Sequence, residues 1–544
     1  MTRSLALTLT LFLIAPAAAS AASWAVGAQP GEIAALRAEL PGATTLVPGH
    51  VLLVQGARPR APAAAYVDNV GVSRRTLAFA NKEPDAGEEW YLAHDRAWSY
   101  WQIPPDLAPV KVAVIDSGID ATHPEFVGRI ASGRSFVGGT WRTDTCGHGT
   151  FVAGEIAANP YNDVGIAGLA FNAKLLVAKV VEPDCDVSTM AEIRGIVWAA
   201  NHGARVINLS IGGVRDPLDP DLDSYSAPEQ AAVEYAYSKG ALVVAAVGNG
   251  TQAPRTPWPY ADYPAALPHV LGVSAVKANG SVPVYSNRDP RYVDLSAPGG
   301  PIFSTIPFNL IDVSLPGCVG VAFSNCGPSD LRSGIGTSFA APQASAAAAL
   351  VIGADPQLSP DQVEWLLERS ATDARATTGC ADCRAGRDSL TGWGMLDIEA
   401  ALERLAGRAL LPPVDADEPN DEAGPAAFPL GSPGTLAATL DYWDDPVDVY
   451  AIKLQKGEKL YARLGREPGA ATSLVLWRPG TTLVTGSPKS LLPNRIEEST
   501  DTSGQERLVY RAAADGTYYL EAKIDSPSSA IDAYSLSVSL QPAA

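Results

Sequence analysis

Three short segments combine glycines with polar side chains and together hold a carboxylate, an imidazole and a hydroxyl group. Asp116 ends an apolar run, His148 lies between two glycines, and Ser338 lies in a glycine-bearing turn ahead of an alanine-rich stretch. In such an arrangement a carboxylate orients an imidazole, which removes the hydroxyl proton as the serine oxygen attacks a carbonyl carbon. The three residue types therefore predict acyl transfer through a covalent intermediate.

A fourth residue, Asn249, follows another apolar run, and its side-chain N–H could donate a hydrogen bond to a developing oxyanion. Each segment taken alone also has a purely structural explanation. An acid or asparagine before glycine is typical of turns, a serine at a helix start is typical of an N-cap, and a lone histidine is usually a surface or core residue. The occurrence of all four in the order Asp, His, Asn, Ser favours catalysis.

These residues need a rigid support, and the hydrophobic pattern predicts one. Near-continuous apolar runs are typical of strands that are buried on both faces of a parallel sheet. Helical stretches at 190–201 and 228–238 lie between them. The alternation predicts a doubly wound α/β domain, in which functional residues gather at the carboxyl ends of the strands. The runs are 111–115, 173–180, 205–210 and 241–246.

Over residues 88–408 the chain resembles the subtilisin-like serine proteases. The Asp–His–Ser order is that of subtilisins and differs from the orders of chymotrypsin-like enzymes and α/β-hydrolases. The three signature blocks are Val114–Gly118, Gly147–Thr150 and Gly336–Ser338. Supporting stretches are Gly165–Ala170, Ile207–Gly213, Ser296–Gly299 and Gly392–Asp397.

The resemblance implies a role for each residue. Ser338 would be the nucleophile, His148 the general base and then acid, and Asp116 the orienting carboxylate. Asn249 and the backbone N–H of Ser338 would form the oxyanion hole. Phe339 stands where the family often has methionine, which removes an oxidisable sulfur beside the nucleophile and predicts better tolerance of peroxide.

The resemblance also implies a substrate pocket with two walls. Small residues on both walls predict room for a sizeable apolar P1 side chain. One wall would be Ser210, Ile211, Gly212 and Gly213, and the other Ala246, Val247 and Gly248. Residues 302–333 look longer than is usual in the family, which leaves two roles open: shaping the primed side of the cleft, or forming a stapled loop.

The rest of the chain predicts export and two further domains. Residues 1–21, with Arg3 and an apolar run, predict a signal peptide. Residues 22–87 resemble the family's propeptide, a small α+β inhibitor and chaperone. A proline- and acid-rich linker, 409–418, precedes short alternating segments that predict an all-β sandwich over 419–544. This last region resembles a bacterial pre-peptidase C-terminal domain.

Composition indicates which classes of partner the protein binds and whether its cysteines form disulfides. Lys plus Arg (40) less Asp plus Glu (59) gives −19, which argues against sequence-independent nucleic-acid binding. Six cysteines in an exported chain predict disulfides, and adjacency favours particular pairs although about fifteen connectivities are open. The Cys-x-x-Cys at 380–383 could also be a redox motif. The favoured pairs are Cys146–Cys185, Cys318–Cys326 and Cys380–Cys383.

The predicted enzyme needs no cofactor for its chemistry. Calcium is common in the family, but the acidic stretch Asp216–Asp223 is more typical of a solvated loop. His-Glu-x-x-His and Gly-x-Ser-x-Gly are absent, which argues against a zinc protease and an esterase. The expected protein is a secreted monomer that acts on proteins or peptides and is inhibited by its own propeptide. After signal cleavage we expect no association with a membrane. The alternative is a catalytically silent secreted binding protein on the same scaffold.

Overall fold

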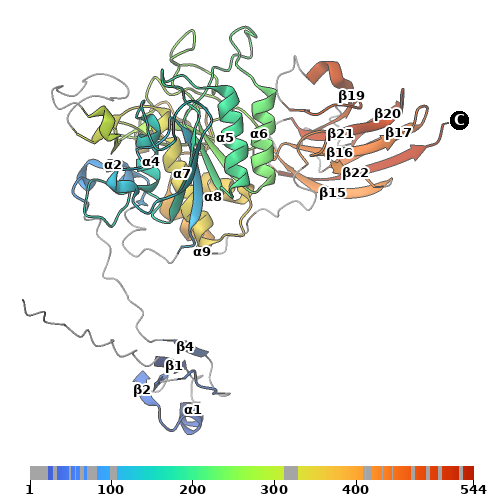
Figure 1. Cartoon of the computed structure of the whole chain (residues 1–544). Coiled ribbons are helices and arrows are strands. Elements are labelled where there is room, and N and C mark those ends of the chain that lie inside the picture. Colours follow the sequence, from blue (N-terminus) through green and yellow to red (C-terminus); the bar gives the residue numbers. More distant parts are fainter. Residues whose placement is uncertain are drawn as a thin grey trace, which may run out of the picture. The chain divides into compact units, whose positions relative to one another are not determined.

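The computed structural model describes residues 23–27, 33–47, 51–55, 57–61, 66–69, 83–97, 107–311, 329–407, 411, 420–431, 433–443, 445–466, 472–485, 491–499, 505–525 and 531–543. Two compact units divide between Ala78 and Phe79 (Figure 1). The predicted signal peptide and nearly all of the predicted linker lie outside the described residues.

The N-terminal unit is a small α+β fold. Its four strands form a sheet of order β2-β3-β1-β4, and every described pairing is antiparallel. Buried Val26, Leu36 and Leu52 form its core. Strand β3 lies in the apolar segment 50–55. The elements are β1 (Ser23–Gly27), α1 (Ile33–Glu39), β2 (Thr44–Val47), β3 (Val51–Gln55) and β4 (Tyr66–Asn69).

The second unit is built on a seven-stranded parallel sheet of order β11-β10-β9-β8-β5-β7-β6. The four strands predicted from apolar runs are confirmed as β5, β7, β8 and β9, the middle of the sheet. Strands β6, β10 and β11 were not predicted because glycine and polar residues interrupt them. The strands are β5 (Val110–Asp116), β6 (Ile130–Ser135), β7 (Ala173–Lys179), β8 (Val206–Leu209), β9 (Leu242–Ala246), β10 (Val270–Lys277) and β11 (Leu295–Gly300).

Helices cover both faces of this sheet. Val112 and Val114 of β5 belong to one buried cluster, and the intervening Ala113 and Ile115 belong to another, as the two-residue period of a strand requires. Helices α4 (His148–Ala157), α7 (Ala341–Ala354) and α8 (Pro360–Ser370) supply the first cluster. The second comes from α5 (Thr189–Asn201) and α6 (Ala227–Ser238), which lie side by side in Figure 1. The predicted doubly wound domain is confirmed.

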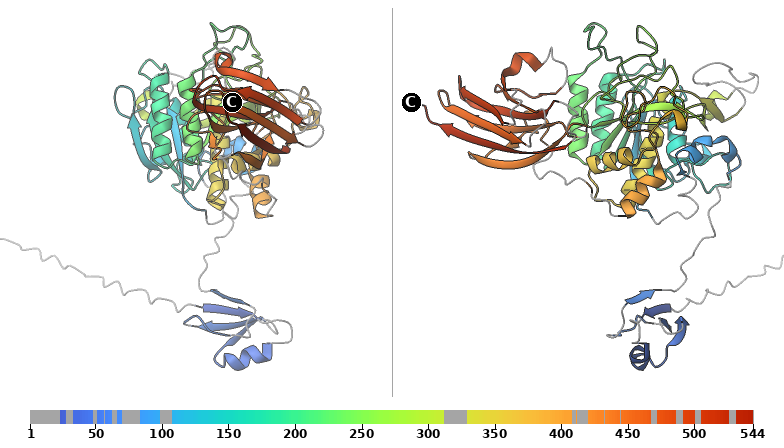
Figure 2. Two further views of the ribbon diagram at one scale, coloured as in Figure 1. Left: turned by 90° about the vertical axis from the view of Figure 1, so that its right-hand side faces the viewer. Right: turned by 180° about the vertical axis from the view of Figure 1, so that it is seen from behind.

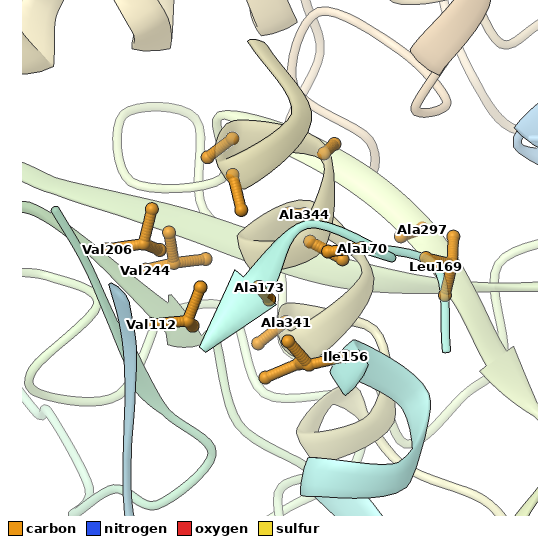
Figure 3. Packing of buried hydrophobic residues seen from close by; sticks show 14 of the residues in the cluster. Val112, Ile156, Leu169, Ala170, Ala173, Val206, Val244, Ala297, Ala341 and Ala344 are labelled. Carbon is orange, nitrogen blue, oxygen red and sulfur yellow. The ribbon is translucent and has the colours of Figure 1, made fainter. Parts of the chain in front are cut away.

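Helix α7 is the central core helix. Figure 3 shows Ala341 and Ala344 of α7 beside strand residues Val112, Val206 and Val244. Small side chains let the helix pack closely against the sheet, where burial of apolar surface stabilises the fold. The stretch 337–354 is long and apolar enough to cross a membrane, but 89% of it is buried, as in a core helix of a soluble domain.

The C-terminal region is a sandwich of two sheets, in the orders β14-β16-β21-β18-β19 and β15-β22-β17-β20 (Figure 2). Strands of both sheets contribute to one buried cluster, so the predicted all-β sandwich is confirmed. The strands are β14 (Phe428–Pro429), β15 (Gly434–Asp441), β16 (Val447–Leu454), β17 (Lys459–Arg466), β18 (Thr472–Trp477), β19 (Arg495–Ser499), β20 (Gln505–Arg511), β21 (Gly516–Ile524) and β22 (Ile531–Gln541).

Candidate active site

Asp116 and His148 meet at the carboxyl edge of the sheet. Asp116 is the last residue of β5 and is 1% exposed, whereas His148 is the first residue of α4. Nδ1 of His148 lies 3.0 and 2.9 Å from the two carboxylate oxygens of Asp116. A Cβ atom on Gly149 would lie 2.3 Å from the carbonyl oxygen of Gly118, so only glycine permits this close approach of α4 to the strand end.

The charge of Asp116 sets the electrostatics of the imidazole. Burial by itself lowers the pKa of His148, but the adjacent carboxylate of Asp116 outweighs it, so the pKa is raised above its ordinary value. The same contact leaves Nε2 as the ring nitrogen that does not face the acid. A histidine held in this way can accept a proton through Nε2.

A second buried acid, Asp144, organises the loop that carries His148. It is fully buried and lies just ahead of α4, but sequence reasoning missed it. An acid a few residues before a helix start is a capping signal that could have revealed it. Its five hydrogen bonds come from the hydroxyl groups of Ser117 and Thr150 and from the backbone N–H groups of Cys146, Gly147 and Thr150.

Ser338 lies in a 3₁₀ turn, Thr337–Phe339, directly before α7. Gly336, which precedes the turn, has φ 153°, a backbone conformation that residues other than glycine rarely adopt. The carbonyl oxygen of Ser338 accepts a hydrogen bond of 2.7 Å from the hydroxyl of Ser210. The turn is therefore fixed from both sides.

Asn249 is oriented by the residue next to Ser338. Its Oδ1 accepts the backbone N–H of Thr337 at 2.9 Å and the Thr337 hydroxyl at 3.1 Å. Because both Thr337 groups are donors, the atom that faces them is the amide oxygen of Asn249. The amide nitrogen, Nδ2, takes no part in the contact with Thr337. Asn249 can therefore offer an N–H beside the turn that carries Ser338.

Phe339 connects the serine turn to the histidine. Its ring is 1% exposed and its centroid lies 5.6 Å from that of His148 and 4.3 Å from that of Phe151. The structure thus brings the four predicted residues to one end of the sheet. Asp116 contacts His148 directly, Phe339 connects His148 to Ser338, and Thr337 connects Ser338 to Asn249.

A sequence profile of the Subtilase family matches residues 108–394, which is more than half of the chain. This chain belongs to the Subtilase family. Subtilisin DY of Bacillus licheniformis is 34% identical over 298 residues, covering 54% of this chain and 92% of that protein. Subtilisin E of Bacillus subtilis (strain 168) is 32% identical over 357 residues, covering 63% and 80%. A solved lanthipeptide protease is 26% identical with a TM-score of 0.46, over 58% of this chain and 94% of that one.

Membership in the Subtilase family makes the protein a serine endopeptidase whose substrates are proteins or peptides. The first predicted pocket wall of this subtilase follows β8. Ser210 is buried and turned toward Ser338, while Gly212 is exposed. Gly213 exchanges two backbone hydrogen bonds of 2.9 Å with Tyr263. The backbones of Ile211 and Gly212, in contrast, take no part in the Gly213–Tyr263 pairing.

The second predicted wall follows β9. Ala246 and Val247 are buried in the domain core, and the carbonyl oxygen of Gly248 accepts the N–H of Asn287 at 3.0 Å. Gly248 has φ 102°. A Cβ there would lie 2.0 Å from Oδ2 of Asp262, an acid that the sequence did not single out.

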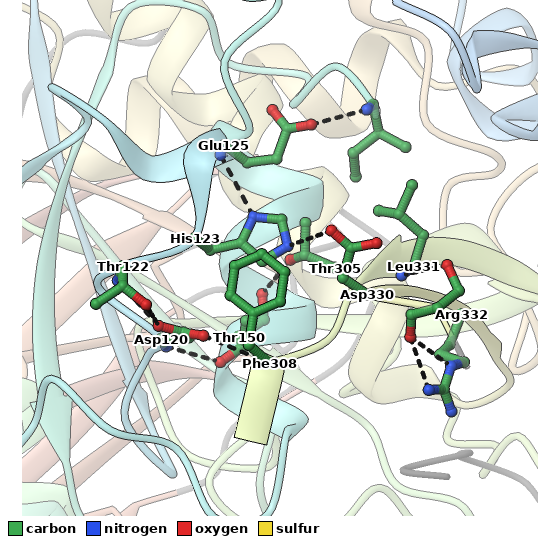
Figure 4. Close-up of polar contacts among 12 residues, drawn as sticks. Asp120, Thr122, His123, Glu125, Thr150, Thr305, Phe308, Asp330, Leu331 and Arg332 are labelled. Carbon is green, nitrogen blue, oxygen red and sulfur yellow. Dashed lines mark hydrogen bonds and ion pairs between the residues drawn. The ribbon is translucent and has the colours of Figure 1, made fainter. Parts of the chain in front are cut away.

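The segment 302–333 of this subtilase begins beside the histidine-bearing loop. The side chain of Asn309 donates to the carbonyl oxygen of Asp144 at 3.1 Å. The neighbouring ring of Phe308 stacks on buried His123 with centroids 5.0 Å apart (Figure 4). The start of the segment is thereby anchored close to the loop that carries His148, while residues 312–328 lie outside the described part of the chain.

Two disulfides are present in the described residues. Cys146 bonds Cys185 and so ties the histidine-bearing loop to the loop after β7. Cys380 bonds Cys383 within a short loop, which is the pairing that adjacency favoured. Cys318 and Cys326 lie outside the described residues.

No three or more histidine, cysteine, aspartate or glutamate side chains form a metal site in the described residues. In the acidic stretch considered for calcium, Oδ1 of Asp216 accepts the N–H groups of Leu218 and Asp219. Oδ1 of Asp223 accepts the N–H of Asp216. These carboxylates accept hydrogen bonds from the backbone of their own loop.

Proposed function

We propose that this subtilase is a secreted endopeptidase, made as a zymogen, with Asp116, His148 and Ser338 as its catalytic triad. The observation that carries the proposal is the 2.9 Å contact between Nδ1 of His148 and the buried carboxylate of Asp116, beside a turn that presents Ser338. Family membership supplies the reaction class, and the local geometry supports the assignment of roles.

In the first half of the reaction, Oγ of Ser338 attacks the scissile carbonyl carbon as its proton passes to Nε2 of His148. Asp116 holds the ring and stabilises the imidazolium that forms. Collapse of the tetrahedral intermediate breaks the C–N bond, and the same proton passes from His148 to the leaving amine. Water then attacks the acyl-enzyme with the same assistance, which releases the acid product and restores Ser338.

The oxyanion of each tetrahedral intermediate would be stabilised by Nδ2 of Asn249 and the backbone N–H of Ser338. Thr337 supports this role because it occupies the amide oxygen of Asn249 and so orients the nitrogen as the donor. A donor oriented in advance stabilises charge in the transition state without reorganising at the moment of reaction.

The remaining regions are assigned on less direct grounds. The antiparallel sheet with one helix at 23–69 supports a propeptide that assists folding and inhibits the enzyme. The apolar N-terminal run supports secretion. The two-sheet sandwich supports a pre-peptidase C-terminal domain that aids export or binds substrate. Structural calcium remains a proposal, tested by the thermal stability of the mature enzyme with and without a chelator.

The decisive experiment compares wild type with Ser338→Ala after export of the full chain. We expect wild type to hydrolyse casein and to be labelled by a fluorophosphonate probe, and the variant to do neither. Ser333→Ala is the matched control, because Ser333 is an exposed serine five residues earlier, and it should behave as wild type. Persistence of the uncleaved N-terminal segment in Ser338→Ala alone would indicate autocatalytic maturation. Labelling of Ser338→Ala, or inert wild type after removal of the N-terminal segment, would reject the proposed triad.

A further inference from the structure

A buried acid, Asp262, lies between the two walls of the predicted substrate pocket. A Cβ on Gly212 of the first wall would lie 3.5 Å from Cβ of Asp262. A Cβ on Gly248 of the second wall would lie 2.0 Å from Oδ2 of the same residue. Gly248 directly precedes Asn249, so the carboxylate lies against the backbone that carries the proposed oxyanion donor.

The backbone holds this acid firmly against both walls. The N–H of Asp262 donates to the carbonyl oxygen of Val247 at 2.9 Å, and the next residue, Tyr263, pairs with Gly213 in both directions. Asp262 is thus fixed between the segments that follow β8 and β9. Asp262 lies in the connection between β9 and β10, and these hydrogen bonds hold it in place.

The carboxylate has no cationic partner in the described structure. Asp262 is 9% exposed. Its carboxylate is hydrogen-bonded to the backbone of Arg215 and to the side chain of Asn287, while its buried Oδ1 has no hydrogen-bond partner. In the part of the chain that the structure describes, no lysine, arginine or histidine forms an ion pair with it. The nearby guanidinium of Arg215 pairs instead with Asp289 at 3.0 Å.

A buried carboxylate without a cationic partner is costly in the free protein. Burial raises the pKa of Asp262 to about 7, because a charge removed from water is unfavourable unless it is paired. A neighbouring amide, Asn287, is also fully buried, and its Nδ2 would lie 2.4 Å from a Cβ on Gly248. The carboxylate of Asp262 is therefore an acceptor that lies against both predicted walls, with the amide of Asn287 beside it.

We propose that Asp262 determines specificity by receiving an arginine or lysine side chain at P1. This inference rests on the proposed function, since it assigns the substrate class of that same site. The aliphatic stem of the P1 residue would pass between Gly212 and Gly248, and its charged end would pair with the carboxylate. An apolar P1 side chain, which the small walls alone predicted, would leave the acid buried without a cationic partner.

The test compares kcat/KM for four peptide p-nitroanilides that differ only in P1: Arg, Lys, Phe and Leu. Wild type should prefer Arg and Lys over Phe and Leu by at least about tenfold. Asp262→Asn, which keeps the shape and removes the charge, should lose at least about 30-fold on Arg and Lys and little on Phe. Asp221→Asn is the matched control, because it removes one charge from an exposed site, and it should keep the wild-type preference.

A second measurement needs no variant. A peptide aldehyde with Arg at P1 should block fluorophosphonate labelling of wild type at lower concentration than one with Phe. Faster cleavage of Phe or Leu than of Arg and Lys by wild type would overturn the inference and leave the proposed function standing. Absence of both cleavage and labelling would instead reject the proposed function, and the inference with it.

Discussion

Oδ1 of Asn249 accepts two hydrogen bonds from Thr337, the residue that precedes the proposed nucleophile. The proposed oxyanion donor and the turn that carries the proposed nucleophile therefore fix each other's position. A change in either residue should act on the transition state more than on the bound substrate, since the oxyanion exists only after attack.

We expect Asn249→Ala to lower kcat by about 10²–10³-fold with little change in KM, because it removes a donor to the oxyanion. Thr337→Val keeps the backbone N–H and loses only the hydroxyl contact, so its kcat should fall by less than about tenfold. Steady-state kinetics on a peptide p-nitroanilide provide the check. A loss carried mainly by KM would contradict the oxyanion role.

Asp144 should tune His148 without touching substrate. Burial lowers the pKa of His148, while the charges of Asp116 and Asp144 raise it. The neutral imidazole is the active base, so kcat/KM should rise as pH increases through this raised pKa. Asp144→Asn removes one of the two charges and should move the acid limb of the pH profile to lower pH.

The same variant should lower the thermal midpoint, because an amide NH₂ would face donors that now share the carboxylate. Asp382→Asn, at an exposed acid, is the control for both measurements. A loss of stability with an unmoved acid limb would restrict Asp144 to a structural role.

Glu422 lies where the sandwich meets the catalytic domain, and it should make the free energy of unfolding depend on pH. It accepts the amide of Gln230 in α6 at 2.6 Å, and burial raises its pKa to about 8. The folded state therefore binds this proton more tightly than the unfolded state does. Its stabilising contribution is complete below the unfolded pKa of about 4.5 and is lost as pH rises through about 8.

Glu422→Gln is permanently neutral and should flatten this part of the dependence. Calorimetric melts at pH 5 and pH 9, in the Ser338→Ala background to prevent autolysis, give the comparison. The parent should lose more in thermal midpoint between the two pH values than the variant does. Equal losses would show that Glu422 does not titrate in this range.

Phe339 should protect the active site from oxidation. Its ring packs against His148 and Phe151, so Phe339→Met would place a thioether at the same site. Oxidation of that sulfur to the sulfoxide would put a polar group beside Ser338. We expect the variant to have a shorter activity half-life in hydrogen peroxide than wild type. An equal half-life would contradict the prediction.

The strands and helices of the α/β domain could largely be predicted because their signals are local. The apolar run 241–246 became β9, and the helical stretch 228–238 became α6, which begins one residue earlier at Ala227. Strands whose sequences contain glycine and proline, such as β11, were missed, because their pairing depends on neighbours distant in the chain.

By itself, the sequence determined the reaction class. The types and order of Asp116, His148, Asn249 and Ser338, each beside glycines or a strand end, limited the chemistry to acyl transfer. Only the tertiary structure decided which groups support and surround them. A capping signal could have pointed to Asp144, but the burial of Asp144 and Asp262 and the groups around them arise from segments brought together by the fold. Periodicity and motif spacing report on neighbours along the chain, whereas the burial and pairing of a charge depend on the whole fold.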